Sequence, residues 1–245
     1  MRSVVYIRSV LYLILFLIAT MCIALWYAPC LWSKKHHATK AKIPLLWTKI
    51  ALTLQKHILD LDYEVRTHTP LPQGGVVYAV KHQSAWETIA LWHIIDRPVF
   101  VLKKELLSIP LFGAYLAASD HIAIDRTDGI KAIQQINTQV AHFLAQGRNV
   151  VMFPEGTRTS VGEDSRYKSG IALLYHALSP TLCPVALNSG CFWSRNAWVR
   201  KAGTVEVEIL PPMPSGLDKQ AFMRSLKEQI EGTTTQLVEH ARLRS

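Results

Sequence analysis

The sequence of 245 residues is poor in cysteine, and its four cysteines follow no recognisable pattern. Cys22 and Cys30 lie in an apolar stretch, while Cys183 and Cys191 are eight residues apart, with no C-x-x-C pair and no histidine at ligand spacing. This spacing argues against a disulfide-stapled miniprotein and gives no support for a zinc site. We therefore interpret the cysteines as small buried hydrophobic residues in a reducing cytosol, and we predict neither a metal ion nor a cofactor.

The sequence also lacks the glycine-rich motifs of several enzyme classes. It has no G-x-S-x-G nucleophile elbow, no G-x-x-x-x-G-K-[ST] phosphate loop and no G-x-G-x-x-G fingerprint, so a serine hydrolase and a nucleotide-binding enzyme are both unsupported. With 49% hydrophobic residues, the chain is neither a disordered tail nor a collagen-like protein. It has enough apolar material to bury a sizeable core.

Acidic residues are missing from the N-terminal region, where the first carboxylate is Asp60. Eight of the 27 Lys and Arg residues precede it, so residues 60–245 carry 19 basic against 18 acidic side chains, although the net charge of the whole chain is +9. The body is therefore nearly neutral. Because it also lacks a stripe of basic and aromatic residues, nucleic acid is not an expected partner.

The basic N-terminal region contains one uncharged apolar segment, Ser9–Ser33. Its 25 residues reach roughly 37 Å as a helix, more than the roughly 30 Å of a bilayer core. The segment is too long for a signal-peptide core, no A-x-A site ends it, and the aromatic residues and lysines at its end resemble an interfacial belt with a cytoplasmic basic flank. We predict a retained membrane anchor, with the body of the chain on the cytoplasmic side.

Two arrangements of this anchor remain open. The segment can span the bilayer, or it can enter one leaflet and return with the helix that follows it. If it spans with the body inside, Arg2 and Arg8 lie outside, which conflicts with the positive-inside tendency.

A second, amphipathic helix is predicted after the anchor, with Pro44 in its first turn. Its apolar residues recur at steps of three and four, and three lysines seven residues apart form another stripe. The pattern is typical of a helix on an anionic lipid surface, or of a helix packed on the domain with its lysines in water. We assign residues 1–60 to the anchor and this helix, and residues 61–245 to a separate domain. The apolar positions are Ile43, Leu46, Trp47, Ile50, Leu54 and Ile58, and the lysines are Lys42, Lys49 and Lys56.

From Gly75 onward, short runs rich in Val, Ile and Phe alternate with helical patterns. This alternation predicts a single α/β domain with a largely parallel or mixed central sheet flanked by helices. The predicted strands are Val76–Val80, Val99–Leu102, Ile122–Asp125, Val150–Phe153, Leu182–Leu187 and Val205–Leu210. The predicted helices are residues 85–95, 104–118, 128–146, 169–178 and 218–240, the last opened by Asp218.

The first polar cluster, Lys81 to Glu87, directly follows a predicted strand, where ligands gather in α/β sheets. If His82 stays in the loop and Glu87 rises from the first helical turn, the carboxylate can orient the imidazole and leave its other nitrogen as a general base. The same spacing has a structural explanation, because Ser84-x-x-Glu87 also fits a capping box in which Glu87 bonds a backbone N–H.

Two further clusters follow strands and carry cations. Arg126 and Arg158 stand at the ends of two predicted strands and can converge on one anion, to which Lys104 can add a charge. Each residue also has a purely structural explanation: Arg158 can pair with Glu155, Arg126 can pair with the preceding aspartate, and Gly156 can supply a turn.

Taken together and in this order, the motifs resemble the glycerolipid acyltransferase family, most closely its bacterial 1-acyl-sn-glycerol-3-phosphate acyltransferases. The motifs are H-x4-E, K-E-L-x-x-I-P-x-F-G, I-D-R, F-P-E-G-T-R and C-P-V-A-L, and the likeness spans residues 76–190. The family usually has aspartate where this chain has Glu87. This departure bears on the role of Glu87 more than on the resemblance to the family.

The resemblance implies transfer of a fatty acyl group from acyl-CoA or acyl carrier protein to the sn-2 hydroxyl of 1-acyl-sn-glycerol-3-phosphate, giving phosphatidic acid. A different lysophospholipid or a lyso-aminolipid acceptor, and a non-catalytic anionic-lipid binder, are the alternatives. By position, the resemblance makes His82 the general base and Glu87 its orienting carboxylate. It assigns acceptor binding to Glu155, Gly156 and Arg158, the phosphate site to Arg126 and Lys104, and a place near the acyl-transfer centre to Pro184 and Val185.

Overall fold

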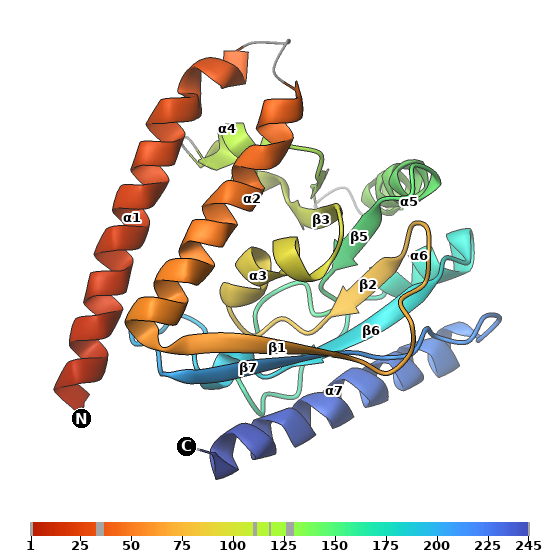
Figure 1. Ribbon diagram of the computed structural model, residues 1–245. Coiled ribbons are helices and arrows are strands. Elements are labelled where there is room, and N and C mark those ends of the chain that lie inside the picture. The colour runs from red at the N-terminus through yellow and green to blue at the C-terminus, as the bar shows by residue number, and fades with distance from the viewer. Residues whose placement is uncertain (1, 33–36, 110–111, 118, 126–129, 245) are drawn as a thin grey trace.

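A computed structural model describes residues 2–32, 37–109, 112–117, 119–125 and 130–244 (Figure 1). A mixed sheet of seven strands runs through the molecule, and helices cover both of its faces. The predicted architecture, a single α/β domain with an apolar N-terminal helix, is confirmed.

The sheet has the strand order β1-β7-β6-β2-β5-β3-β4. The five strands from β6 to β4 are parallel, while β7 and β1 are parallel to each other and run the opposite way. The five parallel strands therefore end at one edge, and the segments that leave this edge after β2, β3 and β5 carry most of the predicted site residues. The strands are β1 Leu61–Thr67, β2 Val77–Val80, β3 Pro98–Lys103, β4 Ile122–Ile124, β5 Asn149–Met152, β6 Leu182–Leu187 and β7 Gly203–Ile209.

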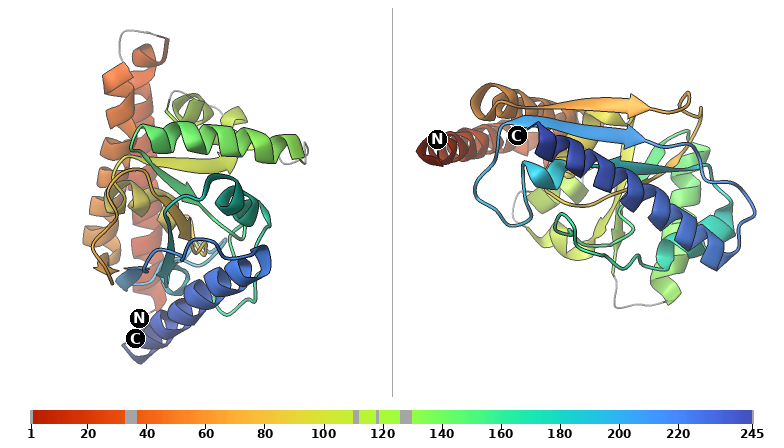
Figure 2. Two further views of the ribbon diagram at one scale, coloured as in Figure 1. Left: turned by 90° about the vertical axis from the view of Figure 1, so that its right-hand side faces the viewer. Right: turned by 90° about the horizontal axis from the view of Figure 1, so that it is seen from below.

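Strands β2, β5 and β6 are buried at every residue, as expected for central strands covered on both faces. One face shares a core with α1, α2 and α3, and the other shares a core with α5, α6 and α7 (Figure 2). Asp218 opens α7 as predicted, since its side chain accepts hydrogen bonds from Gln220 N and Ala221 N. The helices of the body are α3 Trp86–Ile94, α4 Phe112–Ala117, α5 Ile130–Ala145, α6 Gly170–Leu178 and α7 Lys219–Leu243.

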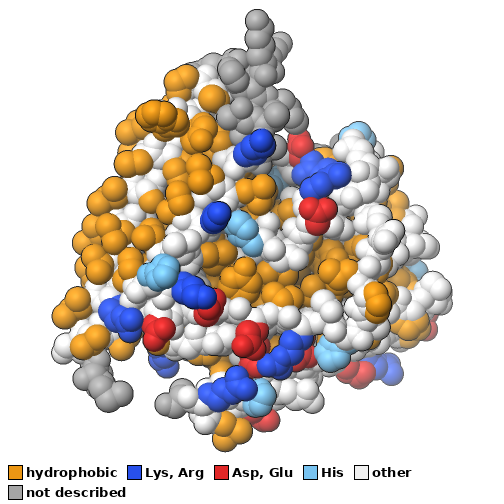
Figure 3. Space-filling model, in the orientation of Figure 1, with side chains coloured by type: hydrophobic (Ala, Val, Ile, Leu, Met, Phe, Trp, Pro, Cys, Tyr) orange, Lys and Arg blue, Asp and Glu red, His pale blue; other side chains and the backbone are white. Residues whose placement is uncertain are grey.

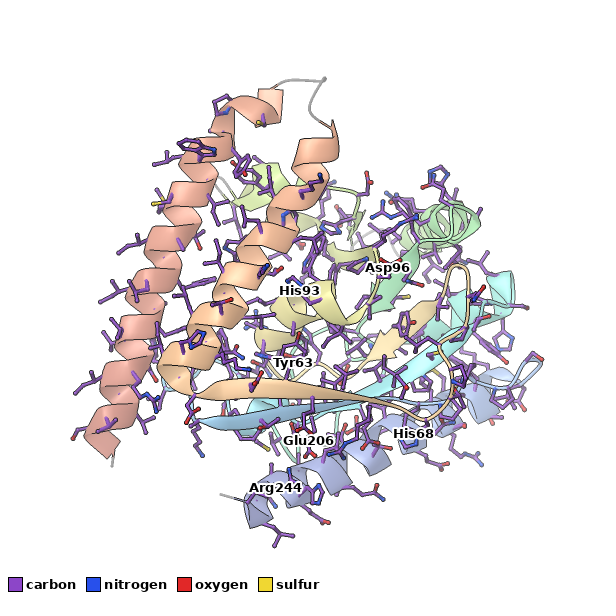
Figure 4. All side chains as sticks on the ribbon, in the orientation of Figure 1. Tyr63, His68, His93, Asp96, Glu206 and Arg244 are labelled. Carbon is purple, nitrogen blue, oxygen red and sulfur yellow. The ribbon has the colours of Figure 1, made fainter. Side chains whose placement is uncertain are left out.

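The N-terminal helices α1 (Arg2–Trp32) and α2 (His37–Leu54) form an antiparallel hairpin along one side of the body (Figure 1). Within the hairpin, Trp47 Nε1 donates a hydrogen bond to Thr20 Oγ1 at 2.9 Å. On its other side, α2 packs on α3, where Thr48 Oγ1 lies 2.9 Å from His93 Nε2 (Figure 4). The second helix is thus packed on the domain, with Lys49 exposed.

Helix α1 is fastened to the body at two points. Near its start, Ser9 Oγ accepts a hydrogen bond from Arg200 N at 2.9 Å, and Tyr12 is fully buried. Fifteen residues after Ser9, the carbonyl oxygen of Ala24 accepts a hydrogen bond from the Tyr115 hydroxyl at 2.7 Å. This length of α1 therefore lies along the body and does not project from it.

The opposite face of α1 is apolar and exposed (Figure 3). By length and composition, Ser3–Cys30 is apolar enough to cross a membrane. Water is an unfavourable environment for so large an apolar patch, which marks a surface for lipid or for another apolar partner. The exposed large hydrophobic residues are Val4, Tyr6, Ile7, Val10, Leu11, Ile14, Leu17, Ile18, Met21, Leu25 and Trp26.

The structure corrects three local predictions. Strand β1 was not predicted, although Leu61, Tyr63 and Val65 alternate with polar residues in the sequence, and only Leu61 is fully buried in the structure. The helix expected over residues 104–118 is two pieces, a 3₁₀ turn at Lys104–Ser108 and then α4. Pro44 lies inside α2 and not in its first turn, because the helix already begins at His37.

Candidate active site

The loop after β2 brings His82 and Glu87 together. The Glu87 side chain is completely buried, and its Oε1 lies 3.7 Å from His82 Nδ1. The same oxygen accepts hydrogen bonds from the backbone N–H groups of Gln83 and Ser84. Glu87 therefore holds the backbone of the loop, as the capping interpretation predicts, and its carboxylate also lies near the imidazole without a hydrogen bond to it.

The His82 ring is held in place but is not sealed off. It stacks on Phe153, which follows β5, with ring centroids 3.9 Å apart, and its side chain remains 12% exposed. Among the described residues, Nδ1 has no hydrogen-bond partner at normal distance. Since Nδ1 is the nitrogen that faces Glu87, Nε2 is the nitrogen left for a substrate.

Glu155, from the turn after β5, holds the histidine loop from the other side. Its Oε1 accepts a hydrogen bond from His82 N at 3.2 Å and lies 3.3 Å from Lys81 Nζ. Burial raises the pKa of Glu155, and the Lys81 charge opposes that shift. The carboxylate is thus directed inward, where it positions the backbone of the general-base candidate.

The buried Lys81 ammonium is shared with the C-terminal helix. Its Nζ lies 2.7 Å and 2.9 Å from the two carboxylate oxygens of Glu231 in α7. The hydroxyl of Tyr167 donates a further hydrogen bond to Glu231 at 2.9 Å. This network connects α7 to the two loops that carry His82 and Glu155. Neither Glu231 nor Tyr167 was predicted from the sequence, because nothing in the local pattern of α7 or of the loop before α6 marks a residue that reaches another element.

Arg158 leaves the same turn beside the histidine. Gly156 has a φ of +69°, a conformation that favours glycine, and so reverses the chain after Glu155. Thr159 N then donates a hydrogen bond to the carbonyl oxygen of His82 at 2.8 Å, which places Arg158, one residue earlier, next to the His82 backbone. Arg158 does not form the alternative ion pair with Glu155, whose partner is Lys81.

Of the two remaining predicted cations, the structure describes only Lys104, which lies along the same edge of the sheet. Lys104 follows β3, is exposed, and lies 3.4 Å from the Asp125 carboxylate, which follows β4. Arg126 lies outside the described residues. Because β3 is separated from β2 only by β5, Lys104 starts about two strand spacings, roughly 10 Å, from the histidine loop.

Gly113 explains why the K-E-L-x-x-I-P-x-F-G segment ends in glycine. A Cβ at this position would lie 2.0 Å from the carbonyl oxygen of Leu107, so only glycine allows α4 to approach the preceding 3₁₀ turn. The Gly113 N–H also donates a hydrogen bond to Ile109 O at 2.7 Å. The segment that starts at Lys104 is therefore a compact loop.

Pro184 and Val185 lie inside the sheet, beside the histidine strand. Both are buried in β6 and pair with Ala79 and Val80 of β2. The carbonyl oxygen of Val185 accepts a hydrogen bond from Lys81 N at 2.9 Å, at the point where β2 ends. These two residues fix the place from which the histidine loop departs.

Comparison with known proteins agrees with this geometry. The family model described as "Acyltransferase" matches residues 62–188. A 1-acyl-sn-glycerol-3-phosphate acyltransferase of Pseudomonas aeruginosa is 36% identical over 186 residues, which cover 76% of this chain and 72% of the relative. The protein of the same name from Escherichia coli is 31% identical over 183 residues, which cover 70% of this chain and 74% of the relative.

A solved structure shares the fold. It is the crystal structure of the 1-acyl-sn-glycerophosphate (LPA) acyltransferase PlsC from Thermotoga maritima, with a TM-score of 0.73 and 19% sequence identity. The match covers 97% of this chain and 98% of that chain, so it includes the N-terminal hairpin as well as the sheet.

Proposed function

Since the chain belongs to the acyltransferase family, we propose that it transfers a fatty acyl group from an acyl thioester to the sn-2 hydroxyl of 1-acyl-sn-glycerol-3-phosphate, which yields phosphatidic acid. The names of its bacterial relatives support this acceptor. The observation that carries the proposal is the position of His82, which lies at the carboxyl edge of the sheet between the Glu87 carboxylate and the loop that bears Arg158.

In the proposed reaction, the acceptor hydroxyl attacks the thioester carbonyl carbon while His82 takes the hydroxyl proton. The tetrahedral intermediate then loses the thiolate by cleavage of the C–S bond, and the proton passes from His82 to the sulfur. Because a thioester is already activated, a positioned base suffices and no enzyme nucleophile is needed. Glu87 stabilises the imidazolium that forms between the two steps, at 3.7 Å from Nδ1.

The acceptor phosphate is assigned to the cations at the same edge. Arg158 has the planar guanidinium that suits a phosphate, and Lys104 and Arg126 follow the two neighbouring strands. In this proposal Glu155 does not touch the acceptor. It holds the His82 loop in place, and the acceptor turn begins only after it.

We further propose that the α1–α2 hairpin lies in the cytoplasmic leaflet of the bacterial inner membrane. The ties of α1 to the body at Ser9 and Ala24 favour a helix that enters one leaflet over one that spans away from the domain. The arrowheads of β2 and β5 point toward the side of the molecule that carries the hairpin (Figure 1). Acyl-CoA and acyl carrier protein, the candidate donors, then reach the site from the cytoplasm.

The test is a lipid-product assay with the full chain in mixed micelles. Acyl-CoA and acyl carrier protein are offered in separate reactions, each with 1-acyl-sn-glycerol-3-phosphate, a phosphodiester lysophospholipid or a lyso-aminolipid. We expect phosphatidic acid with the first acceptor and a loss of about 10²–10⁴-fold in rate for His82→Gln. His68→Gln, at the exposed end of β1, is the matched control and should retain the wild-type rate.

Two results would contradict the proposal. Full activity in His82→Gln would show that His82 is not the general base. A preference for an acceptor without a terminal phosphate would show that the proposed substrate is wrong. Arg158→Ala refines the second point, because it should weaken selection of the phosphate monoester over the other acceptors, and unchanged selection would contradict its role.

A further inference from the structure

A loop between β6 and β7 presents an exposed tryptophan beside the start of α1. Trp198 is 78% exposed, although large aromatic side chains are usually buried in a soluble domain. Its neighbours Arg195 and Lys201 are also exposed. Figure 2 shows this part of the chain looping out next to the N-terminal end of α1.

The loop is ordered by contacts at its base. Phe192 and Trp193 are buried, and Lys201 N donates a hydrogen bond to Phe192 O at 2.8 Å, which closes the loop. Arg200 NH1 donates to the carbonyl oxygen of Trp198 at 3.2 Å. The exposed tryptophan is therefore displayed by a closed loop whose base belongs to the core.

The same loop is joined directly to the membrane helix. Arg200 N donates a hydrogen bond to Ser9 Oγ of α1. The Arg200 guanidinium lies 4.1 Å from the ring centroid of Trp193 and 5.0 Å from that of Tyr12 in α1. Trp198 lies two residues before Arg200, so it is displayed close to the first turns of α1.

The charge of this region fits an anionic bilayer. No acidic residue occurs between Asp164 and Glu206, just as none precedes Asp60 in the hairpin. An indole flanked by cations matches the composition of a membrane–water interface, where the ring lies at the level of the headgroups and the cations attract lipid phosphates.

We propose that residues 194–202 form a second contact with the bilayer, in which Trp198 enters the headgroup region of an anionic phospholipid leaflet while Arg195 and Lys201 bind lipid phosphates. This inference rests on the proposed membrane association of α1. With contacts at α1 and at this loop, the lipid surface fixes the rotation of the catalytic domain about the axis of α1 as well as its depth.

The experiment measures tryptophan quenching in the full chain, reconstituted into vesicles of phosphatidylcholine with or without phosphatidylglycerol. Lipids brominated near the headgroup report contact with the bilayer, and iodide reports contact with water. The emission of Trp198 is obtained as the difference in fluorescence between wild type and Trp198→Phe. The emission of Trp26, which is 80% exposed on α1, is obtained in the same way from Trp26→Phe. Both differences are taken in each vesicle type.

We expect brominated lipid to quench most of the Trp198 emission in vesicles with phosphatidylglycerol, and iodide to quench little of it. Arg195→Gln combined with Lys201→Gln should lower the quenching of Trp198 by brominated lipid and raise its quenching by iodide. The matched control, Lys219→Gln with Arg224→Gln, alters two exposed cations near the start of α7 and should leave the quenching of Trp198 unchanged.

The outcomes separate this inference from the membrane proposal. If Trp26 is quenched by lipid but Trp198 is quenched only by iodide, the loop is a solvent-exposed or protein-binding surface and the inference is overturned. If neither tryptophan is quenched by lipid, the membrane association of α1 itself is wrong. Loss of lipid quenching at Trp198 with the control pair, but not with the loop pair, would also overturn it.

Discussion

Replacing Lys81 with methionine tests the buried charge network behind the histidine loop. The Lys81 side chain is 2% exposed and the Glu155 side chain 1%, and Nζ lies 3.3 Å from Glu155 and 2.7 Å from Glu231. Methionine preserves most of the volume but removes the ammonium that lies between the two carboxylates. The variant therefore leaves two like charges close together, one of them fully buried.

The expected cost is large for a single substitution. Removing one partner of a buried ion pair destabilises a protein by about 3–5 kcal/mol, a substantial part of the roughly 5–15 kcal/mol that keeps a typical domain folded. For a chain of this length, each kcal/mol lowers the melting temperature by about 2–4 °C, so the drop should be about 6–20 °C. The matched control is Lys227→Met. Lys227 lies on α7, as Glu231 does, and its exposed ion pair with Asp164 should contribute at most about 1 kcal/mol.

The assay is thermal unfolding in one detergent at neutral pH, with acyl transfer measured well below the melting temperature. Adding Glu155→Gln and Glu231→Gln to Lys81→Met removes both unpaired charges and should restore part of the lost stability. The reasoning would be refuted if Lys81→Met had the same melting temperature as the Lys227→Met control. It would also be refuted if the triple variant were less stable than Lys81→Met alone.

Two further predictions concern pH and packing. Burial lowers the pKa of His121 to about 4, with a smaller contribution from the Arg148 charge, so the folded state binds this proton less readily than the unfolded state. The contribution of neutral His121 to the free energy of unfolding should be fully present above about pH 6.5 and should be lost as the pH falls toward 4. In thermal unfolding across this range, His121→Asn should flatten the fall in melting temperature, and an unchanged slope would exclude this histidine as its cause. Gly113→Ala should cost about 1–3 kcal/mol and reduce activity, because its Cβ meets the Leu107 backbone, whereas Gly232→Ala, in open space on α7, should be neutral or stabilising by up to about 1 kcal/mol; equal melting temperatures for the two variants would contradict the clash.

The central strands and the site loops were predictable from the sequence because their signals are local. Strands β2, β5 and β6 are continuous apolar runs, and the motifs of His82 and Glu155 begin where β2 and β5 end. The parallel topology then brings the loop of His82 next to that of Glu155. The capping interpretation of Glu87 is confirmed by its hydrogen bonds to the backbone, whereas the orienting interpretation stays a prediction, since the same oxygen lies 3.7 Å from His82 Nδ1.

The parts that were missed depend on contacts between distant segments. Strand β1 pairs with β7, about 140 residues later, and most of its residues stay partly or fully exposed because it lies at the edge of the sheet, although its apolar and polar residues alternate. The partner of Lys81 is 150 residues away in α7. Likewise, the ties of α1 to Arg200 and Tyr115 depend on tertiary packing, which a hydropathy pattern cannot specify.

The bridge from Lys81 to α7 has a consequence for the order of events during synthesis. All seven strands precede Glu231 in the chain, so the sheet and the histidine loop can be made while the ammonium still lacks this carboxylate. Domains begin to fold from the N-terminus as they emerge from the ribosome. The loops that carry His82 and Glu155 thus acquire their final support only after α7 has been translated.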